Sequence, residues 1–334
     1  MSEWLIYRGT GEPHDDLATK LPPPPRWRTF DGDPVVNPLL GSENSSARRL
    51  GELARAATYQ ASSEEVELVN AALYLRRPLL VTGKPGTGKS TLAHSVAREL
   101  KLGPVLNWPI TSRSNRLEGL YQYDALARLQ DASLGQRSGS QVDLDIGRYI
   151  RLGPLGTALL PYQKPRVLLI DELDKSDIDL PNDLLTIFEE GEYEIRELSR
   201  IAREQEEARV LIHDGTDQVT IHGGRVKCHA FPLVVITSNG ERDFPPPFLR
   251  RCLRLEIKTP SAERLAAIVR AHLGDEAVKA SSDLIQTFVS RREDGVLATD
   301  QLLNAIFLTF RQAWPGDRDG LVNAVMQRLN TGDS

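Results

Sequence analysis

The stretch Gly83-Lys84-Pro85-Gly86-Thr87-Gly88-Lys89-Ser90 follows a short apolar run, Leu79-Leu80-Val81, and precedes a helical pattern. It matches GxxxxGK[ST] in full, and a strand before the motif and a helix after it are the setting that the motif requires. Its glycines let backbone N–H groups turn inward around phosphate oxygens, and the helix N-terminus adds its positive end. The stretch therefore predicts a phosphate-binding loop between a strand and a helix. The predicted nucleotide contacts are Gly83, Lys84, Pro85, Gly86, Thr87, Gly88, Lys89, Ser90 and Thr91.

Two side chains at the end of this loop have separate predicted roles. Lys89 is placed to reach the β- and γ-phosphates, and the Ser90 hydroxyl is placed on Mg²⁺. The helix that follows has an apolar face, and Gly103 is expected to end it. That face consists of Leu92, Val96 and Leu100.

Further strands are predicted by continuous apolar runs. VLNWPI (105–110), RVLLI (166–170) and PLVVIT (232–237) join the run before the loop, and each is separated from the next by enough sequence for a crossover. Uninterrupted apolar runs are typical of parallel strands that are buried on both faces. The pattern predicts an α/β fold with a parallel sheet covered by helices on both sides.

Asp171 and Glu172 come at the end of the run at 166–170, where a parallel sheet presents its ligand-binding edge. We expect Asp171 to orient Mg²⁺ through its waters, and Glu172 to polarise a water molecule for attack on the γ-phosphate. The sequence Asp174-Lys175-Ser176-Asp177 superficially resembles the guanine-reading NKxD motif, but it lies beside the metal strand rather than on a later one. The predicted ligands are therefore ATP and Mg²⁺.

Outside this core, the chain divides into an N-terminal arm (1–46), an α/β nucleotide-binding domain (47–259) and a helical lid (260–334). The prolines at 22–25 favour an extended arm, which we interpret as a strap on the following domain rather than as a ligand for an SH3-like groove. Ordered structure is expected from about Ala47. Ser62 and Glu65 form a capping box for a helix, whose apolar positions are Val66, Val69, Leu73 and Leu75.

The lid is predicted as four helices, at 261–274, 275–293, 299–314 and 319–330. Apolar residues recur on one face of the first and third of these helices, as in a helix that packs on a core. The residues on these faces are Leu265, Ile268, Val269, Leu302, Leu303, Ile306 and Phe310.

Composition excludes several classes of protein. The 41 Lys and Arg against 46 Asp and Glu give a net charge of −5, without the basic excess of a dedicated nucleic-acid binder. Cys228 and Cys252, the two cysteines, are too few for a disulfide scaffold. No apolar run approaches the roughly 18 residues of a membrane span, and the first residues do not match a secretory signal. We expect a cytoplasmic protein that does not contact membranes.

The phosphate loop, the strand ending in Asp171-Glu172 and a later strand ending in Thr237-Ser238-Asn239 together resemble the AAA+ ATPases over residues 47–330, and most closely the MoxR-like family. The resemblance implies a P-loop NTPase fold of the AAA+ type with an all-helical lid. It also implies that Asn239 is sensor 1, beside the γ-phosphate, where its amide could hold the attacking water. The alternative is that Asn239-Gly240 forms an ordinary turn.

The same resemblance assigns a role to Arg250 or Arg251. In AAA+ proteins an arginine at this place reaches the γ-phosphate held by the neighbouring subunit, and Arg251 fits the family's register better than Arg250. An arginine suits this role because its planar fork matches phosphate oxygens. The family therefore implies a ring of subunits, expected to be a hexamer; the alternative is a surface salt bridge.

Two segments resemble MoxR-like inserts. GRYIRLGPLGTALL (147–160) contains a Gly-Pro turn, and residues 209–230 alternate around a His-Gly-Gly turn, which predicts a β-hairpin. Three histidines, His213, His222 and His229, fall in the second segment. A metal site there is conceivable, but exposed strand residues are the favoured interpretation.

One feature departs from the family. The second-sensor arginine would fall near residues 298–300, where the chain has Ala-Thr-Asp. Arg291, Arg292 or Lys279 could substitute from an adjacent helix, or hydrolysis could be slow. Both explanations remain open.

MoxR-like proteins are thought to remodel or activate partner proteins, often proteins with von Willebrand factor A domains. The resemblance thus implies a ring-forming Mg-dependent ATPase that acts on a protein client. Two alternatives are a nucleic-acid motor of the McrB type, disfavoured by the acidic composition, and an ATP-binding scaffold with little turnover. The sequence identifies neither the client nor the pathway.

Overall fold

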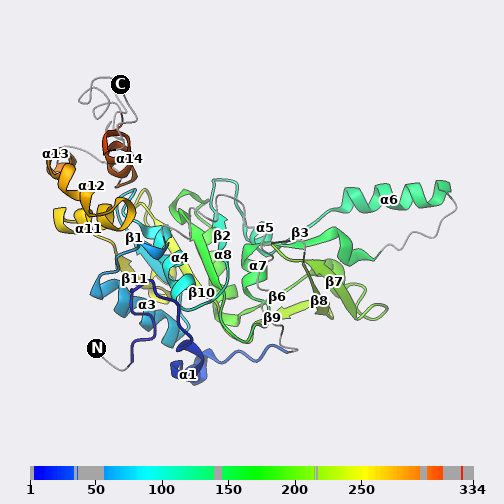
Figure 1. The fold of residues 1–334 in the computed structure, drawn as a ribbon. Coiled ribbons are helices and arrows are strands. Elements are labelled where there is room, and N and C mark those ends of the chain that lie inside the picture. The colour runs from blue at the N-terminus through cyan, green and yellow to red at the C-terminus, as the bar shows by residue number, and fades with distance from the viewer. Residues whose placement is uncertain are drawn as a thin grey trace.

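The computed structural model describes residues 4–33, 36, 56–138, 145–213, 215, 217–293, 299–310 and 325. Its centre is a five-stranded parallel sheet of order β11-β1-β10-β5-β2 (Figure 1). The strands are β1 (Leu79–Thr82), β2 (Leu106–Pro109), β5 (Val167–Asp171), β10 (Leu233–Ser238) and β11 (Leu253–Glu256). The predicted parallel sheet is confirmed, and each predicted strand agrees with the observed one to within one or two residues.

Helices cover both faces of this sheet, as the apolar runs predicted. Along β1, Leu79 and Val81 point into one core with α3 (Ser63–Leu75) and α4 (Lys89–Glu99). Leu80, between them, points into the opposite core with α7 (Pro154–Ala158) and α8 (Leu180–Glu190). Consecutive side chains of a strand alternate between faces, so a strand buried on both sides must be apolar at every position.

A second sheet of six strands, in the order β3-β4-β7-β8-β9-β6, packs beside the first. The sequence predicted only a hairpin around the His-Gly-Gly turn, which is confirmed: β8 pairs antiparallel with β9, and His222 lies opposite Arg225. β7 also pairs antiparallel with β8, and Arg209 lies opposite Thr220. The His-Gly-Gly turn then leads from β8 to β9. The strands are β3 (Tyr121–Tyr123), β4 (Ile150–Leu152), β6 (Glu192–Glu194), β7 (Glu207–Leu211), β8 (Gln218–His222) and β9 (Arg225–Lys227).

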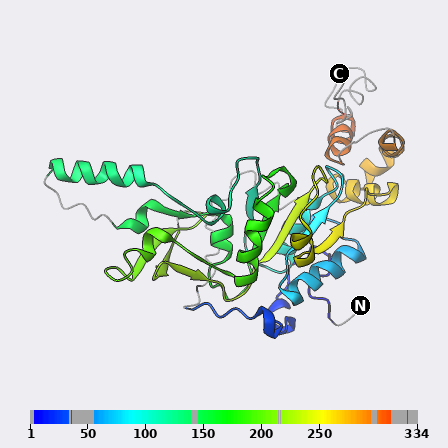
Figure 2. The same ribbon diagram turned by 180° about the vertical axis from the view of Figure 1, so that it is seen from behind.

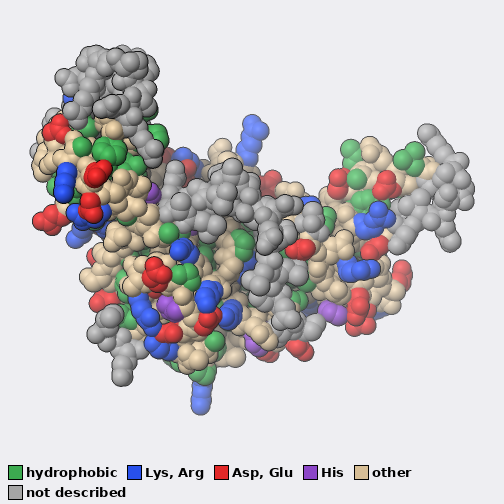
Figure 3. Space-filling model, viewed as in Figure 1, with side chains coloured by type: hydrophobic (Ala, Val, Ile, Leu, Met, Phe, Trp, Pro, Cys, Tyr) green, Lys and Arg blue, Asp and Glu red, His purple; other side chains and the backbone are tan. Residues whose placement is uncertain are grey.

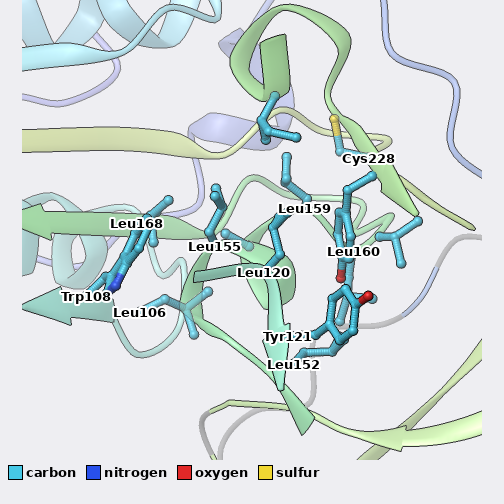
Figure 4. Close-up of a cluster of buried hydrophobic side chains, with 14 of the residues drawn as sticks. Leu106, Trp108, Leu120, Tyr121, Leu152, Leu155, Leu159, Leu160, Leu168 and Cys228 are labelled. Carbon is cyan, nitrogen blue, oxygen red and sulfur yellow. The ribbon is translucent and has the colours of Figure 1, made fainter. Parts of the chain in front are cut away.

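One continuous apolar core joins the two sheets (Figure 4). Trp108 and Leu168 come from the first sheet, Leu152 and Tyr121 from the second, and Leu155 from α7 between them. The second sheet is therefore part of the α/β domain. Short elements complete it: η1 (Arg26–Arg28), α5 (Arg116–Leu120), η2 (Ile146–Tyr149), η3 (Leu173–Lys175), α9 (Arg196–Ser199) and α10 (Pro246–Arg251).

The N-terminal segment lies on the α/β domain as a strap, so ordered structure begins well before Ala47, contrary to expectation. Ile6 and Tyr7 are fully buried, and the Asn70 side chain accepts hydrogen bonds from both of their backbone N–H groups, at 2.7 and 3.0 Å. The buried Glu99 carboxylate, at the end of α4, accepts from the N–H groups of Thr10 and Gly11 at 2.8 and 2.9 Å. The strap also includes a short helix, α1 (Leu17–Lys20).

The capping prediction for α3 is half confirmed. Ser62 Oγ accepts from the Glu65 N–H at 3.3 Å, but the Glu65 side chain turns to Tyr59 and Arg264 instead of reaching back. Val66, Val69 and Leu73 are buried, whereas Leu75 is exposed and was wrongly assigned to the apolar face.

The lid consists of α11 (Ala262–Leu273), α12 (Asp275–Ala280), α13 (Ser282–Glu293) and α14 (Thr299–Phe310), at the opposite end of the molecule from the second sheet (Figures 1 and 2). The single helix expected at 275–293 is wrong, because the chain breaks at the buried Ser281 into α12 and α13. Of the helix expected at 319–330, all residues but 325 lie outside the described part of the chain.

Both cysteines are buried and unpaired, as small apolar side chains are. Burial raises the pKa of each thiol to about 12. Within the described part of the chain, the helices are too short or too polar to span a membrane.

Candidate functional site

The phosphate loop connects β1 to α4 at the carboxyl edge of the parallel sheet. Gly83, Gly86 and Gly88 have φ values of 147°, 72° and 94°, a region that side-chain-bearing residues rarely adopt. A Cβ atom on Gly83 would also lie 2.5 Å from the Ile257 carbonyl oxygen. Gly88 caps α4 without any side-chain hydrogen bond, so the first N–H groups of this helix point into the loop, where an anion is favoured.

Lys89 connects the loop to the end of β10. Its Nζ donates to the Gly83 and Lys84 carbonyl oxygens at 2.8 and 3.0 Å, and to Asn239 Oδ1 at 2.8 Å. Burial lowers the pKa of Lys89, and the negative charges of Asp171, Asp174 and Glu172 oppose that shift. These oxygens hold the ammonium group at the loop, where it can exchange them for phosphate oxygens.

Asp171 is the centre of an oxygen-rich cluster at the same edge. Its Oδ1 accepts from the Ser90 and Thr237 hydroxyls, both at 2.7 Å. Thr237 Oγ1 in turn accepts from the Glu172 N–H at 2.8 Å. Hydroxyl and carboxylate oxygens suit Mg²⁺, which binds through one or two protein ligands plus substrate phosphates and water. The donor set of Ser90 and Asp171 therefore fits the magnesium site that the sequence predicted.

Glu172 occupies a left-handed conformation, with φ 61° and ψ 50°, directly after β5. For a residue with a Cβ atom this costs roughly 1 kcal/mol, and such strain clusters at functional sites. Its carboxylate accepts from Lys175 Nζ at 2.6 Å and from Asn239 Nδ2 at 3.0 Å. The Lys175 hydrogen bond lowers the pKa of Glu172, Asn239 adds to the effect, and burial opposes it. Glu172 is therefore an ionised base at neutral pH.

A cavity of about 500 Å³ opens above these residues, between the α/β domain and the lid. One wall is polar and contains the phosphate loop, Asp171, Glu172 and Asn239, while Pro260, Ile268 and Leu303 add apolar surface from the lid side. Tyr59, on the segment before α3, lies against Gly88. A polar end for phosphates and an apolar end for a base fit a nucleoside triphosphate.

The two arginines of α10 do not join this cavity. Arg251 pairs with Glu189 of α8 and also donates to the Pro247 carbonyl oxygen at 3.3 Å. Arg250 is exposed, and neither arginine is among the residues that line the cavity. Within one chain, the structure therefore separates Arg250 and Arg251 from the other predicted site residues.

The second-sensor position agrees with the sequence analysis. Thr299 and Asp300 line the cavity, so an acidic residue stands where the AAA+ resemblance implied an arginine. Neither Lys279 nor Arg291 is among the described lining residues, and the Arg292 side chain lies outside the described part. Arg264 of α11, which sequence reasoning missed, does line it, and its Nη2 pairs with Glu65 Oε1 at 2.9 Å.

Other lining residues were also missed: Thr58, Tyr59, Gln60, Thr237, His272 and Asn304. Only Thr237 had a usable signal, because the predicted strand 232–237 ends at it, two residues before Asn239. The three histidines of the hairpin region do not form a metal cluster: no group of three or more His, Cys, Asp or Glu suited to a metal occurs among the described residues.

Comparison with known proteins agrees with this geometry. Residues 78–252, more than half of the chain, match the family described as AAA domain (dynein-related subfamily). No curated protein matches the chain. The crystal structure of domain III from the Thermotoga maritima replication initiation protein DnaA is similar at 15% identity, over 82% of this chain and 97% of that chain, with a TM-score of 0.39. That similarity is too low to carry an argument. On the family match, the chain belongs to the dynein-related subfamily of AAA domains and has the AAA+ nucleotide-binding fold with a helical lid.

Proposed function

We propose that the protein hydrolyses ATP with Mg²⁺. The observation that carries this proposal is the chain of contacts from Lys89 through the Asn239 amide to the Glu172 carboxylate, beside the Ser90–Asp171 pair. Lys89 can bind phosphate, the Asn239 amide can orient water and the ionised Glu172 can accept a proton. These three groups meet at one edge of the parallel sheet.

Each residue has a role that its chemistry permits. The loop N–H groups and Lys89 bind the phosphates, and Glu172 accepts a proton from the attacking water. Asn239 Nδ2 holds the Glu172 carboxylate in place for that transfer. When bound, Mg²⁺ neutralises phosphate charge and orients the oxygens, and Ser90 and Asp171 are the residues that would hold it.

The assembly in this proposal is a ring, expected to be hexameric, of the MoxR type. Arg250 and Arg251 support it because they lie outside their own chain's cavity, where they are available to a neighbouring subunit. The Arg251–Glu189 pair is about half exposed, and exposed pairs contribute little stability, so an exchange of partners costs little.

We further propose a protein client, for which von Willebrand factor A domain proteins are candidates through the MoxR resemblance. Helix α6 (Ala125–Ser138) supports a protein partner. Its Arg128 and Asp131 side chains bond to Tyr123 and Tyr149 of the body, at 3.1 and 2.8 Å. Its three leucines instead face solvent and are more than 60% exposed: Leu126, Leu129 and Leu134. Hydrophobic side chains are visible on the projecting end of the molecule in Figure 3, where Figure 1 places α6.

A second candidate is an ATP-binding scaffold with little turnover, which the acidic Asp300 at the cavity favours. Steady-state phosphate release with and without Mg²⁺, on the full chain and on Glu172→Gln, distinguishes the two. Magnesium-dependent release that Glu172→Gln abolishes supports hydrolysis. ATP binding without release supports the scaffold.

A further inference from the structure

Asn239 lies just beyond the end of β10, which stops at Ser238. The next residue, Gly240, turns away with φ 79°, so the segment that carries the Asn239 amide is outside the ladder of the sheet. Its contacts to Lys89 and Glu172 are with side chains that must themselves exchange partners when phosphates bind. Something else must therefore fix the backbone of Asn239.

The fixed contact comes from Asp174. Its Oδ2 accepts from the backbone N–H groups of Asn239 at 2.9 Å and of Glu241 at 3.0 Å. The N–H of Gly240, between them, donates to Ser238 Oγ at 3.0 Å. Three consecutive N–H groups are thus held by side chains, and two of them by one carboxylate.

Asp174 is itself held firmly. It lies in η3, where the neighbouring Leu173 is fully buried and the Lys175 and Ser176 N–H groups close the turn at 3.0 Å each. Asp174 is 4% exposed, and its Oδ1 has no hydrogen-bond partner. A buried carboxylate with one unpartnered oxygen costs stability unless its other contacts are strong. The two contacts to the Asn239 segment are the ones that offset this cost.

We infer that Asp174 is a positioning residue for the proposed hydrolysis: it fixes the Asn239 backbone so that the side-chain amide meets both the phosphate site and Glu172. This inference rests on the proposed function. Asp174 acts as a hydrogen-bond acceptor, so an uncharged acceptor of the same shape can replace it. Its negative charge also acts on Lys89, but its hydrogen bonds reach the site through the Asn239 segment, so its loss lowers kcat no further once the Asn239 amide is gone.

The kinetic test compares Asp174→Ala, Asp174→Asn, Asn239→Ala and the double variant Asp174→Ala/Asn239→Ala. Asp174→Ala lowers kcat by about tenfold or more and changes KM for ATP by a smaller factor, because misplacement of a catalytic group affects the chemical step. Asp174→Asn retains most of kcat, and the double variant is no slower than Asn239→Ala. Asp177→Ala, which removes an exposed carboxylate of the same segment, keeps wild-type kcat. The inference would be overturned if the kcat losses of the two single variants multiplied in the double variant. It would also be overturned if kcat of Asp174→Asn were as low as that of Asp174→Ala.

A second measurement needs no hydrolysis and so separates this inference from the proposed function. Hydrogen exchange at the amides of Asn239 and Glu241, without nucleotide, speeds up about tenfold or more in Asp174→Ala and stays protected in Asp174→Asn. Unchanged protection in a folded Asp174→Ala overturns the inference even if the wild type hydrolyses ATP. If Asp174→Ala does not fold, hydrogen exchange is measured on Asp174→Asn instead. Loss of protection at the amides of Asn239 and Glu241, while the rest of the sheet stays protected, overturns the inference.

Discussion

Lys89 Nζ lies 2.8 Å from Asn239 Oδ1, so the phosphate-loop lysine and the amide at the end of β10 hold one another. The lysine can only donate, which fixes the amide orientation, with Nδ2 toward Glu172. Phosphates that bind at Lys89 would therefore change the contacts of Asn239 directly and, through Asn239, those of Glu172.

Lys89→Ala should lower ATP affinity by about 100-fold or more, because it removes charge-assisted hydrogen bonds worth about 1.5–3 kcal/mol each. Titration with a fluorescent ATP analogue measures this. Lys101→Ala, which removes a surface lysine paired with Asp15, should bind as the wild type does. Undiminished affinity in Lys89→Ala would place the nucleotide elsewhere.

Glu172→Gln should bind ATP normally but release phosphate about 100-fold or more slowly, since the amide cannot accept the proton. Gln has the same shape but a single acceptor oxygen, so it keeps the contact from Lys175 or from Asn239 but not both. The matched control is Asp177→Asn, an exposed carboxylate a few residues along. Normal turnover in Glu172→Gln would remove this residue from the mechanism.

Lys175→Met should shift the pH dependence of hydrolysis. The Lys175 hydrogen bond is the main cause of the lowered pKa of Glu172, so its loss raises that pKa. Because only the carboxylate form is a base, activity should then fall at a higher pH during acidification than in the wild type. A kcat profile against pH measures the acid limb. The control Lys101→Met should leave the acid limb where it is in the wild type. If Lys175→Met also leaves it there, Lys175 does not control the pKa of Glu172.

The parallel sheet and the phosphate loop were predictable because each depends on a local pattern. β1, β5 and β10 are continuous apolar runs, and the loop is a contiguous motif. The second sheet was not predictable beyond its hairpin, because β3, β4 and β6 are three residues long. In β6 a single buried residue, Tyr193, lies between two exposed glutamates, which is too little for a periodic signal.

The site was predictable where residues end strands, and not where the lid contributes. Asp171, Glu172 and Asn239 follow β5 and β10, whose carboxyl ends meet at one edge. Arg264 had no such marker, since it reaches Glu65 of α3 only when the lid is folded onto the α/β domain. The division of the lid at Ser281 was detectable, because Ser281-Ser282-Asp283 contains capping residues.

Arg251→Ala should bind ATP but hydrolyse it poorly, and mixing with Lys89→Ala should restore part of the activity. In a mixed ring, an intact nucleotide site of one subunit can meet the intact arginine of its neighbour. Arg250→Ala, tested in the same way, shows which of the two arginines acts. Assembled mixed rings without any recovery would exclude action between subunits.

Arg264→Ala should destabilise the fold by about 3 kcal/mol. Glu65 is 2% exposed, and removal of its cation leaves a buried carboxylate whose remaining partner is the Tyr59 hydroxyl at 2.8 Å. Calorimetric unfolding without nucleotide measures the loss. Glu65→Gln with Arg264→Ala should be more stable than Arg264→Ala alone, because the unpaired charge is gone.

The control for this pair lies on the same helix. Arg270 pairs with Asp275 at 2.7 Å, but both side chains are more than half exposed, so Arg270→Ala should change stability by less than about 1 kcal/mol. Equal losses in Arg264→Ala and Arg270→Ala would mean that burial of Glu65 does not determine the strength of the contact. The larger loss at Arg264 would identify the Glu65–Arg264 pair as the link that holds α11, and with it the apolar wall of the cavity, against the α/β domain.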